Sequence, residues 1–485
     1  MTPEEHMRTA QHRWALRPVR DRLRIVRRVR AAIAERSAEL EAASRTPQRR
    51  GPSEGLVAEV LPLADACRFL EREAPRLLAP RRRGRRGRPG WLSGVRLDIR
   101  REPFGRVLVI GASNYPLLLP GVQALQALVT GNAVVVKPGT GGRSAAELLG
   151  RILQEAGLPE GLYEVLDESP EAARQAIAAG VDKVVLTGSA RTGEAVLNQL
   201  AGHLVPSAME LSGCDAVFVR PDADLDLVVR SLRFGLQLNG SATCIAPRRV
   251  FAPPALMPEL EGRLAAAVAG LPAVPVPPST LNFVTTLIRQ AVADGGRPLN
   301  WSPAGPDRMR PVVVADARPG MRLLQEDVFA PVLSLVTAAD DEEALAADAR
   351  CPYALGAAVF GGEAGARRLA CRIAAGAVVV NDLIVPTADP RFPFSGRGRS
   401  GFGVTRGAEG LLELTTVKAV AVRRARFRPH LDDPLPADEG LFRGWLLAAH
   451  GRGAVRRCIG LRTIVRALRQ RTRSGRSDGT GSGGL

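Results

Sequence analysis

The chain of 485 residues is too long for one simple core, so its length predicts two or three domains. Hydrophobic residues make up 45% and charged residues 24%, as in soluble globular proteins, and no apolar run is long enough to span a bilayer. The amino-terminal segment lacks the apolar core of a signal peptide, which favours a cytoplasmic location. Six scattered cysteines without CxxC spacing argue against a disulfide framework, and no metal site is expected.

The net charge of +18 is concentrated in two segments. Residues 76–106 carry 11 Arg against two acids, and residues 423–485 carry 14 Arg against five acids, so each segment has a net charge of +9. The rest of the chain is neutral, whereas a nucleic-acid enzyme typically lines its main body with basic charge. Trp91 is the one aromatic residue in the first basic segment's loop, so nucleic acid is not the expected partner.

The amino-terminal part of the chain is predicted to be helical. Between residues 9 and 44, apolar residues recur at helical spacing among Arg and Glu, which predicts one or two amphipathic helices. Another helix is expected over residues 56–78. Residues 80–90, PRRRGRRGRPG, are expected to form a mobile loop, because like charges repel and Gly and Pro interrupt regular structure.

From residue 106 onward, apolar strands alternate with helices, which is the pattern of a parallel, doubly wound α/β sheet. Strands are expected at residues 106–112, 132–139, 162–167 and 182–189. A second set of strands and helices follows to about residue 390. The expected domains are residues 1–213 with a Rossmann-like sheet, an α/β domain at 214–394, a β-rich return segment at 395–424, and a basic extension at 425–485 with a disordered end.

Polar residues follow the predicted strands, at the edge of the sheet where ligands bind. Ser113 and Asn114 follow one strand, and Lys137 ends the next. The segment TGSARTG at residues 187–193 joins a strand to a helix, so its amides can bind a phosphate, although a tight packing turn would have the same residues. Lys137 is either a ligand of phosphate or ribose, or a solvated lysine.

Two further residues are candidates for chemistry. Glu210 lies in the apolar segment SAMELSG, where desolvation would raise its carboxyl pKa and suit a general base; a structural carboxylate is the alternative. Cys244 follows in NGSATCIAPRR, and taken alone it has the features of a small buried side chain. Together with the amide of Asn114, these groups are the parts that acyl-thioester chemistry requires.

The order of seven motifs between residues 9 and 424 resembles the aldehyde dehydrogenase superfamily. The matching segments are GASNYPLLLP, GNAVVVKPG, LTGSARTG, MELSG, NGSATCIAPRR, QEDVFAPVLSL and FPFSGRGRSGFG. The resemblance implies that Cys244 attacks the aldehyde carbonyl while Asn114 and the Cys244 amide hold the oxyanion. Hydride would pass to NAD or NADP, and Glu210 would activate the water that hydrolyses the thioester.

The resemblance also implies an aldehyde dehydrogenase-like fold with a doubly wound cofactor domain, an α/β catalytic domain and a small β element for oligomerisation. It assigns Lys137 to the adenosine ribose, Gly188 and Ser189 to the phosphate turn, and Gly193 to close helix packing. It assigns Asp327 to the nicotinamide ribose and Phe329 to the nicotinamide. Ser113 and Thr140 complete the expected cofactor-binding residues.

Five departures from the family pattern are visible in the sequence. In the family, Gly-Gln often stands directly before the residue that precedes the cysteine, and here Ser241 and Ala242 occupy these two positions. Asp327 replaces a Glu. Thr140 replaces an acid that repels a 2′-phosphate, and Arg143 could attract one, so NADP is permitted beside NAD. The chain between Cys244 and residue 326 is compressed, and TPQRRGPSEG at residues 46–55 stands in place of a Glu-Thr-Gly-Lys-like stretch.

Two alternatives to hydrolytic aldehyde oxidation remain. One is a coenzyme A-acylating enzyme, although such members commonly lose the equivalent of Glu210. The other is a catalytically weak family member that acts as a scaffold or a membrane-associated protein. A homodimer or tetramer is expected through LTTVKAVAV, and the basic tail is either a helix on an anionic membrane surface or a solubilising helix packed on the body.

Overall fold

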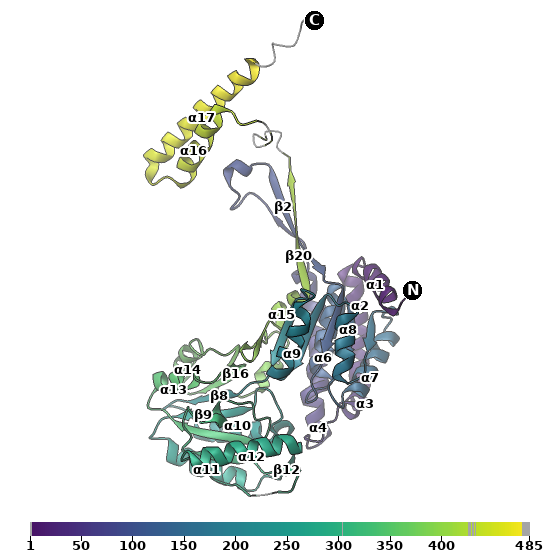
Figure 1. Cartoon of the computed structure of the whole chain (residues 1–485), viewed down its shortest axis with the longest axis vertical. Helices are drawn as coiled ribbons and strands as arrows, with labels where there is room; N and C mark the ends of the chain where they lie inside the picture. Colours follow the sequence, from purple (N-terminus) through teal and green to yellow (C-terminus); the bar gives the residue numbers. More distant parts are fainter. Residues whose placement is uncertain (1, 303, 425–427, 429–430, 432, 478–485) are drawn as a thin grey trace. The chain divides into compact units, whose positions relative to one another are not determined.

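The computed structural model describes residues 2–302, 304–424, 428, 431 and 433–477, and it divides into two compact units. Unit 1 comprises residues 1–79 and 101–416, and unit 2 comprises residues 80–100 and 417–485. Figure 1 labels the elements of both units along the chain. The catalytic candidates all belong to unit 1, and both basic segments contribute to unit 2.

The first sheet of unit 1 has six strands in the order β19-β7-β6-β3-β4-β5, which are parallel except for β19. Runs of β-branched residues form its central strands, which are buried on both faces. This confirms the doubly wound sheet expected from the sequence. The strands are β3 Arg106–Ile110, β4 Ala133–Lys137, β5 Tyr163–Val165, β6 Lys183–Gly188, β7 Ser207–Leu211 and β19 Gly401–Phe402.

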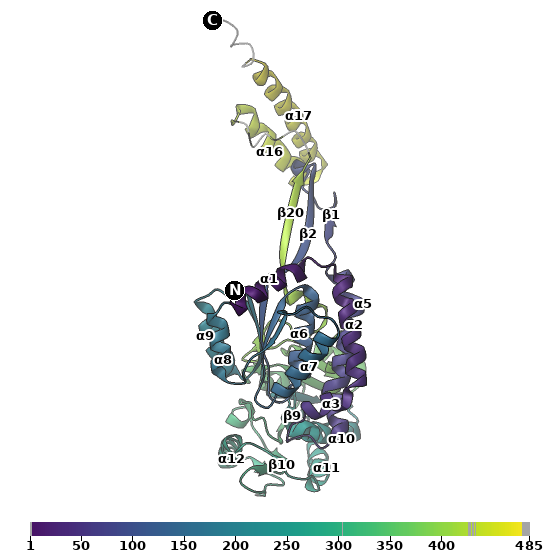
Figure 2. The same ribbon diagram turned by 90° about the vertical axis from the view of Figure 1, so that its right-hand side faces the viewer.

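Helices cover both faces of this sheet, with α2 and α5 on one side and α8 and α9 on the other (Figure 2). The helices at the start of the chain are α1 Pro3–Ala15, α2 Val19–Glu35, α3 Ser37–Ala43, α4 Pro52–Gly55, the π-helix η1 Leu56–Val60, and α5 Leu61–Leu77. The later ones are α6 Leu118–Thr130, α7 Arg143–Glu155, α8 Pro170–Ala178, α9 Ala190–Ala201 and α15 Gly407–Glu413.

The second sheet of unit 1 has seven strands in the order β11-β13-β14-β9-β8-β16-β17, which are parallel except for β11. The strands are β8 Asp215–Val219, β9 Pro247–Ala252, β11 Arg297–Pro298, β13 Val312–Ala315, β14 Val332–Thr337, β16 Gly356–Phe360 and β17 Ala377–Val380. The compressed segment between Cys244 and residue 326 contains two α-helices, α11 Met257–Ala269 and α12 Pro278–Ala293, with strands before, between and after them.

The other elements of this half of unit 1 are α10 Leu225–Gln237, α11 Met257–Ala269, α13 Asp341–Asp348 and α14 Glu363–Ala370. Its 3-10 turns are η3 Leu238–Ser241, η4 Arg322–Leu324 and η5 Val385–Ala388. Its short strands pair as β10 Val274–Pro275 with β12 Arg308–Met309, and β15 Tyr353–Ala354 with β18 Arg397–Gly398.

Unit 2 contains the sheet β1-β2-β20 and a helical hairpin. Its elements are β1 Arg81–Arg83, η2 Gly90–Leu92, β2 Val95–Pro103, β20 Thr415–Arg423, α16 Pro436–His450 and α17 Gly453–Ser477. The expectation of a loop throughout residues 80–90 was wrong at β1, where the backbone pairs with β2 while all three arginine side chains point to solvent and remain hydrated.

The expected disordered end falls mostly on residues 478–485, which lie outside the described residues. Within the described residues, no helix combines the length and the apolar character needed to cross a membrane.

Candidate active site

Cys244 and Glu210 each line two cavities of unit 1. One cavity has a volume of about 660 Å³ and mostly apolar walls, and the other has a volume of about 490 Å³ and more polar walls. Glu210 comes from β7, Cys244 from the loop between η3 and β9, and Asn114 from the turn after β3. The fold therefore brings together, at the carboxyl end of the parallel sheet, three residues that lie far apart in the sequence.

The polar cavity collects most of the residues that the sequence assigned to a cofactor. Its lining includes Ser113, Asn114, Lys137, Thr140, Gly188, Ser189, Asp327 and Phe329. Gly193 lies outside this lining, and a Cβ atom there would come within 2.9 Å of the Leu211 side chain, so glycine lets α9 pack closely on β7. The described residues contain no cluster of His, Cys, Asp or Glu able to hold a metal ion.

The polar cavity has the features of a dinucleotide site. A Cβ atom at Gly139 would lie 2.3 Å from the carbonyl carbon of Ala112, so only glycine allows this close turn. Ser189 caps α9 by accepting a hydrogen bond from the Thr192 amide at 3.2 Å, which places the amino end of that helix at the cavity. Free amides at a helix amino end bind phosphate groups, so the cavity fits a pyrophosphate.

Beside Thr140 and Lys137 of the polar cavity stand charges that the sequence reasoning did not identify. Glu168 accepts hydrogen bonds from the amides of Gly141 and Arg143, both at 2.9 Å, beside Thr140. Arg143 forms ion pairs with Glu147 and Asp167, and it does not line the cavity. Burial lowers the pKa of Lys137, whereas Glu168 and Asp167 raise it. An acidic group therefore stands near Thr140 although it comes from a different turn.

The loop before Cys244 has an unusual backbone. Asn239, Gly240 and Ser241 have φ angles of 49°, 59° and 62°, in the left-handed region that disfavours residues with a Cβ atom. Arg248, buried in β9, holds this loop by donating to the Ser241 hydroxyl at 2.8 Å and to the Ser241 carbonyl at 2.7 Å. A further bond of 2.8 Å runs from Arg248 to the Ala330 carbonyl. Ser241, which departs from the family pattern, is thus held in place by Arg248.

Glu210 is buried, and its two carboxylate oxygens have different surroundings. Oε2 accepts a hydrogen bond from the Thr405 hydroxyl at 2.7 Å, while Oε1 has no hydrogen-bond partner among the described residues. Burial raises the pKa of Glu210, and Arg406 and Thr405 oppose that shift. One oxygen is therefore held in place, and the other is free to accept a proton from water.

Cys244 is partly exposed in the two cavities. Burial raises the pKa of its thiol, and the nearby carboxylates of Glu210 and Asp215 raise it further, whereas Arg406 lowers it. Without a ligand, the thiol is therefore protonated at neutral pH. Arg406 lies with its guanidinium 4.4 Å from the centre of the Phe394 ring, and it donates to the Thr387 carbonyl at 2.7 Å.

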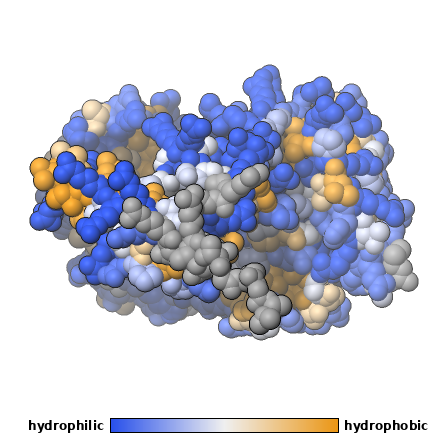
Figure 3. Space-filling model, turned by 90° about the horizontal axis from the view of Figure 1, so that it is seen from above, coloured by the Kyte–Doolittle hydropathy of each residue, from blue (hydrophilic) through white to orange (hydrophobic). Residues whose placement is uncertain are grey.

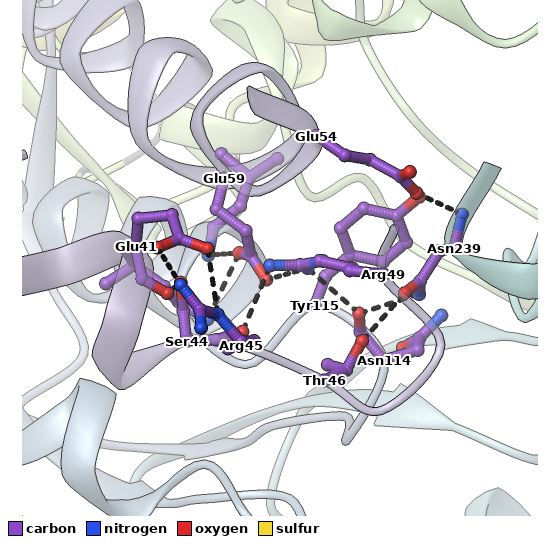
Figure 4. A network of polar contacts seen from close by, with 12 residues as sticks. Glu41, Ser44, Arg45, Thr46, Arg49, Glu54, Glu59, Asn114, Tyr115 and Asn239 are labelled. Atoms are coloured by element: carbon purple, nitrogen blue, oxygen red, sulfur yellow. Dashed lines mark hydrogen bonds and ion pairs between the residues drawn. The ribbon is translucent and has the colours of Figure 1, made fainter. Parts of the chain in front are cut away.

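A network of polar contacts connects the amino-terminal helices to this site (Figure 4). Arg49 and Glu59 form an ion pair that is buried completely, and Arg49 also donates to the Asn114 carbonyl at 3.3 Å. The Asn239 side chain donates to the same carbonyl at 3.0 Å and to the Ala242 carbonyl at 3.2 Å. Thr46 and Glu54 bind Asn239, so the segment 46–55, which departs from the family pattern, supports both Asn114 and the cysteine loop.

Asn114 itself also contacts the cysteine loop. Its side-chain nitrogen donates to the Ala242 carbonyl at 3.0 Å, and the neighbouring Tyr115 hydroxyl lies 2.8 Å from the Thr243 hydroxyl. These contacts fix the backbone on the amino-terminal side of Cys244.

Sequence reasoning missed the supporting residues Arg49, Glu59, Arg248, Thr405 and Arg406. The PRR segment after Cys244 offered one signal, because arginines inside a buried strand must have partners. The others offered none, because their contacts with the site join segments far apart in the sequence, as in Arg49 with Asn114 and Thr405 with Glu210. Glu59 is on the π-helix η1, a rare element that often occurs at functional sites.

Comparisons with known proteins agree with this geometry. The profile of the aldehyde dehydrogenase family matches residues 4–420. Betaine aldehyde dehydrogenase of Cereibacter sphaeroides is 33% identical over 435 residues, which cover 85% of this chain and 87% of that protein. The 4,4′-diapolycopene aldehyde oxidase of Methylomonas is 27% identical over 423 residues, covering 85% and 79%.

Solved structures are similar as well. NADP-dependent glyceraldehyde-3-phosphate dehydrogenase of Bacillus halodurans, complexed with NADP, aligns with a TM-score of 0.81 at 26% identity, covering 87% of this chain and 90% of that one. PnpE in complex with nicotinamide adenine dinucleotide aligns with a TM-score of 0.81 at 25% identity, covering 88% and 90%. The chain therefore belongs to the aldehyde dehydrogenase family, whose enzymes oxidise aldehydes with NAD or NADP.

Proposed function

We propose that the chain oxidises an aldehyde to a carboxylic acid through a thioester on Cys244, which water then hydrolyses. The observation that carries the proposal is that Cys244 and Glu210 both line the polar and the apolar cavity. A substrate in one cavity and a cofactor in the other would meet at the sulfur atom. A scaffold without activity would not need these two groups together at such a junction.

The polar cavity would hold NAD or NADP, which supplies the hydride acceptor. Gly139 leaves room for the backbone turn, the amino end of α9 binds phosphate, and Lys137 and Asp327 reach the riboses. Thr140 permits a 2′-phosphate, but Glu168 carries negative charge beside it. The two cofactors should therefore both support turnover, with Glu168 favouring NAD.

In the acylation half of the reaction, the Cys244 sulfur forms a bond to the carbonyl carbon and the thiol proton passes to water. The negative oxygen that develops accepts hydrogen bonds from the Cys244 amide and the side chain of Asn114. Loss of hydride from that carbon leaves the thioester. Arg406 supports this step because its positive charge favours the thiolate.

In the hydrolysis half, Glu210 accepts a proton from water through the oxygen that has no protein partner. The hydroxide adds to the thioester carbon, the carbon–sulfur bond breaks, and the carboxylic acid and the Cys244 thiolate result. Retention of Glu210 favours water over coenzyme A as the acceptor.

The apolar cavity suggests the substrate class. Its walls include Pro62, Leu118, Leu119, Phe234, Leu238, Ile245, Ile384, Val385 and Phe394. A volume of about 660 Å³ with these walls favours an aldehyde with a sizeable apolar body over a small or strongly hydrated one. The 4,4′-diapolycopene aldehyde in the name of one relative fits this class.

The chain should also form a homodimer or tetramer. β20 is the end strand of the sheet β1-β2-β20, and it exposes Val417, Val420 and Val422, which lie on both of its faces. An edge strand with exposed β-branched residues is a site for pairing with another strand.

The test is an aldehyde panel that ranges from acetaldehyde to long-chain and aromatic aldehydes, with NAD and NADP in parallel, following absorbance of the reduced cofactor. We expect kcat/KM to rise with chain length, Cys244→Ala to be inactive, and turnover to be independent of coenzyme A. Equal inactivity of the wild type and Cys244→Ala across the panel would contradict the proposal. Strict dependence on coenzyme A would replace hydrolysis with acyl transfer.

A further inference from the structure

Nearly the whole charge excess of the protein belongs to unit 2. This unit has 23 Arg and Lys residues against six acids, a net charge of +17, whereas unit 1 has 44 against 43. The two basic segments are more than 300 residues apart in the sequence, yet they meet: Gly90 lies so close to the Trp445 ring that a Cβ atom would be 2.7 Å from it. The fold thus gathers the positive charge into one small unit.

The helical hairpin of this unit has a small buried core and exposes several large apolar residues. The helices α16 and α17 touch at Gly444 and Gly460, where a Cβ atom would clash with the opposite backbone. Among the residues whose burial is described, the buried apolar core of the hairpin comprises Leu441, Ile464 and Ala467. The residues left on the surface are Phe442, Leu446, Val455, Ile459, Leu461, Val465 and Leu468, with exposed fractions between 37% and 74%.

The surface of α17 is arranged in rows. Each of the packed residues Gly460, Ile464 and Ala467 is followed by an exposed apolar residue and then by an exposed arginine. The apolar row is therefore Leu461, Val465 and Leu468, and the basic row is Arg462, Arg466 and Arg469. Because one residue turns a helix by about 100°, the basic row runs beside the apolar row for its whole length.

The second helix extends the apolar row. In α16, Phe442 follows the packed residue Leu441 in the same way, and Leu446 lies one turn further along. The two helices run antiparallel, since Asp438 pairs with Arg471 near one end and Gly444 meets Gly460 near the middle. In an antiparallel pair of helices, the residues that follow the packed residues by one position point to the same side of both helices. Both apolar rows therefore lie on one face of the hairpin. In the space-filling view, which is coloured by hydropathy, orange hydrophobic groups stand beside blue hydrophilic ones (Figure 3).

We propose that this face of the α16–α17 hairpin binds the surface of a membrane that contains anionic lipids. An apolar row flanked by arginines is the pattern of a helix that lies in the headgroup region. Each arginine near such a surface adds to the attraction, and the other arginines of unit 2 contribute at longer range. A second copy of the hairpin is a poor occupant of this face, because it would bring the arginine rows that flank the two apolar rows against each other.

Membrane binding of this kind goes beyond the aldehyde oxidation proposed above. It would place the enzyme where aldehydes with apolar bodies partition, but it does not depend on catalysis. The two ideas therefore fail separately.

The test is flotation of the full-length protein with vesicles of phosphatidylcholine alone or of phosphatidylcholine mixed equally with phosphatidylglycerol. We expect flotation with the mixed vesicles only, and weakening at high salt. The triple variant Arg462→Gln, Arg466→Gln and Arg469→Gln should lower the partition coefficient about 100-fold. The triple variant Leu461→Gln, Val465→Gln and Leu468→Gln should lower it about tenfold or more.

Matched controls are Arg13→Gln, Arg68→Gln and Arg72→Gln, and separately Leu16→Gln with Leu204→Gln, which alter exposed residues of unit 1. These should float like the wild type. Circular dichroism and activity on a soluble aldehyde check that the hairpin variants fold. Failure of the wild type to float, equal binding to both vesicles, or hairpin variants that match the controls would overturn the proposal. Displacement from vesicles by duplex RNA, with RNA affinity unchanged in the leucine and valine variant, would instead make this a nucleic-acid surface.

Discussion

In unit 1, Arg49, Arg248 and Arg249 are buried and directed at fixed acceptors, whereas in unit 2 Arg462, Arg466 and Arg469 face solvent. The buried arginines donate to backbone carbonyls around Cys244 or form ion pairs. The exposed ones follow one another at helical spacing. A guanidinium with five N–H groups can thus either hold a backbone in place or present charge to a partner, and burial decides which.

The largest effect is expected for Arg49→Met. This change leaves Glu59 buried opposite an apolar side chain, and breaking such a pair lowers the free energy of unfolding by about 3–5 kcal/mol. Burial already raises the pKa of Glu59, so without Arg49 the carboxyl takes up a proton more readily, and the loss should be smaller at low pH than at high pH. Urea unfolding at two pH values measures this.

The control for Arg49→Met is Arg462→Met, an exposed position whose replacement should change stability by less than about 0.5 kcal/mol. The double variant Arg49→Met with Glu59→Met should recover part of the loss, because it leaves no buried charge. If the losses in free energy of unfolding of Arg49→Met and Glu59→Met simply add up in the double variant, the two residues do not act as a pair.

A smaller effect is expected for Arg248→Met. The substitution removes the three hydrogen bonds to Ser241 and Ala330, and leaves buried acceptors without donors, which costs about 2–3 kcal/mol. Because the cysteine loop loses its support, kcat should fall more than KM rises. Steady-state kinetics and thermal unfolding measure both. Normal kcat with reduced stability would mean that Arg248 supports the fold but does not position Cys244.

The smallest change is expected for Arg406→Met, in the pH dependence of activity. Arg406 lowers the pKa of both Glu210 and Cys244, so its removal raises both values. In the proposed mechanism both groups act in their deprotonated forms, and the rising limb of kcat/KM should therefore move to higher pH. The profile of Arg462→Met should coincide with that of the wild type. A limb that stays in place, or moves to lower pH, would exclude this electrostatic role.

Local features of the chain could be predicted from the sequence, whereas contacts of buried arginines across the fold could not. Asn114, Lys137 and the turn at residues 187–193 were predictable because strand ends in a parallel sheet share one edge. Glu210 and Cys244 were identified by motif order, and both line the two cavities. Arg49 and Arg406 were not predictable, since each acts on a site residue through contacts across the fold. Within unit 2, the sequence predicted helix but not a hairpin, because the Gly444–Gly460 contact is a tertiary one.

The sequence by itself determined the doubly wound sheet, the membership of the family and the candidate residues for its chemistry, because strand periodicity and motif order are local properties of the chain. Only the tertiary structure decided how Ser241 is held, which oxygen of Glu210 is free, and that two distant basic segments belong to one unit. These depend on burial and on contacts between segments, and burial determines whether an arginine positions a backbone or remains charged surface.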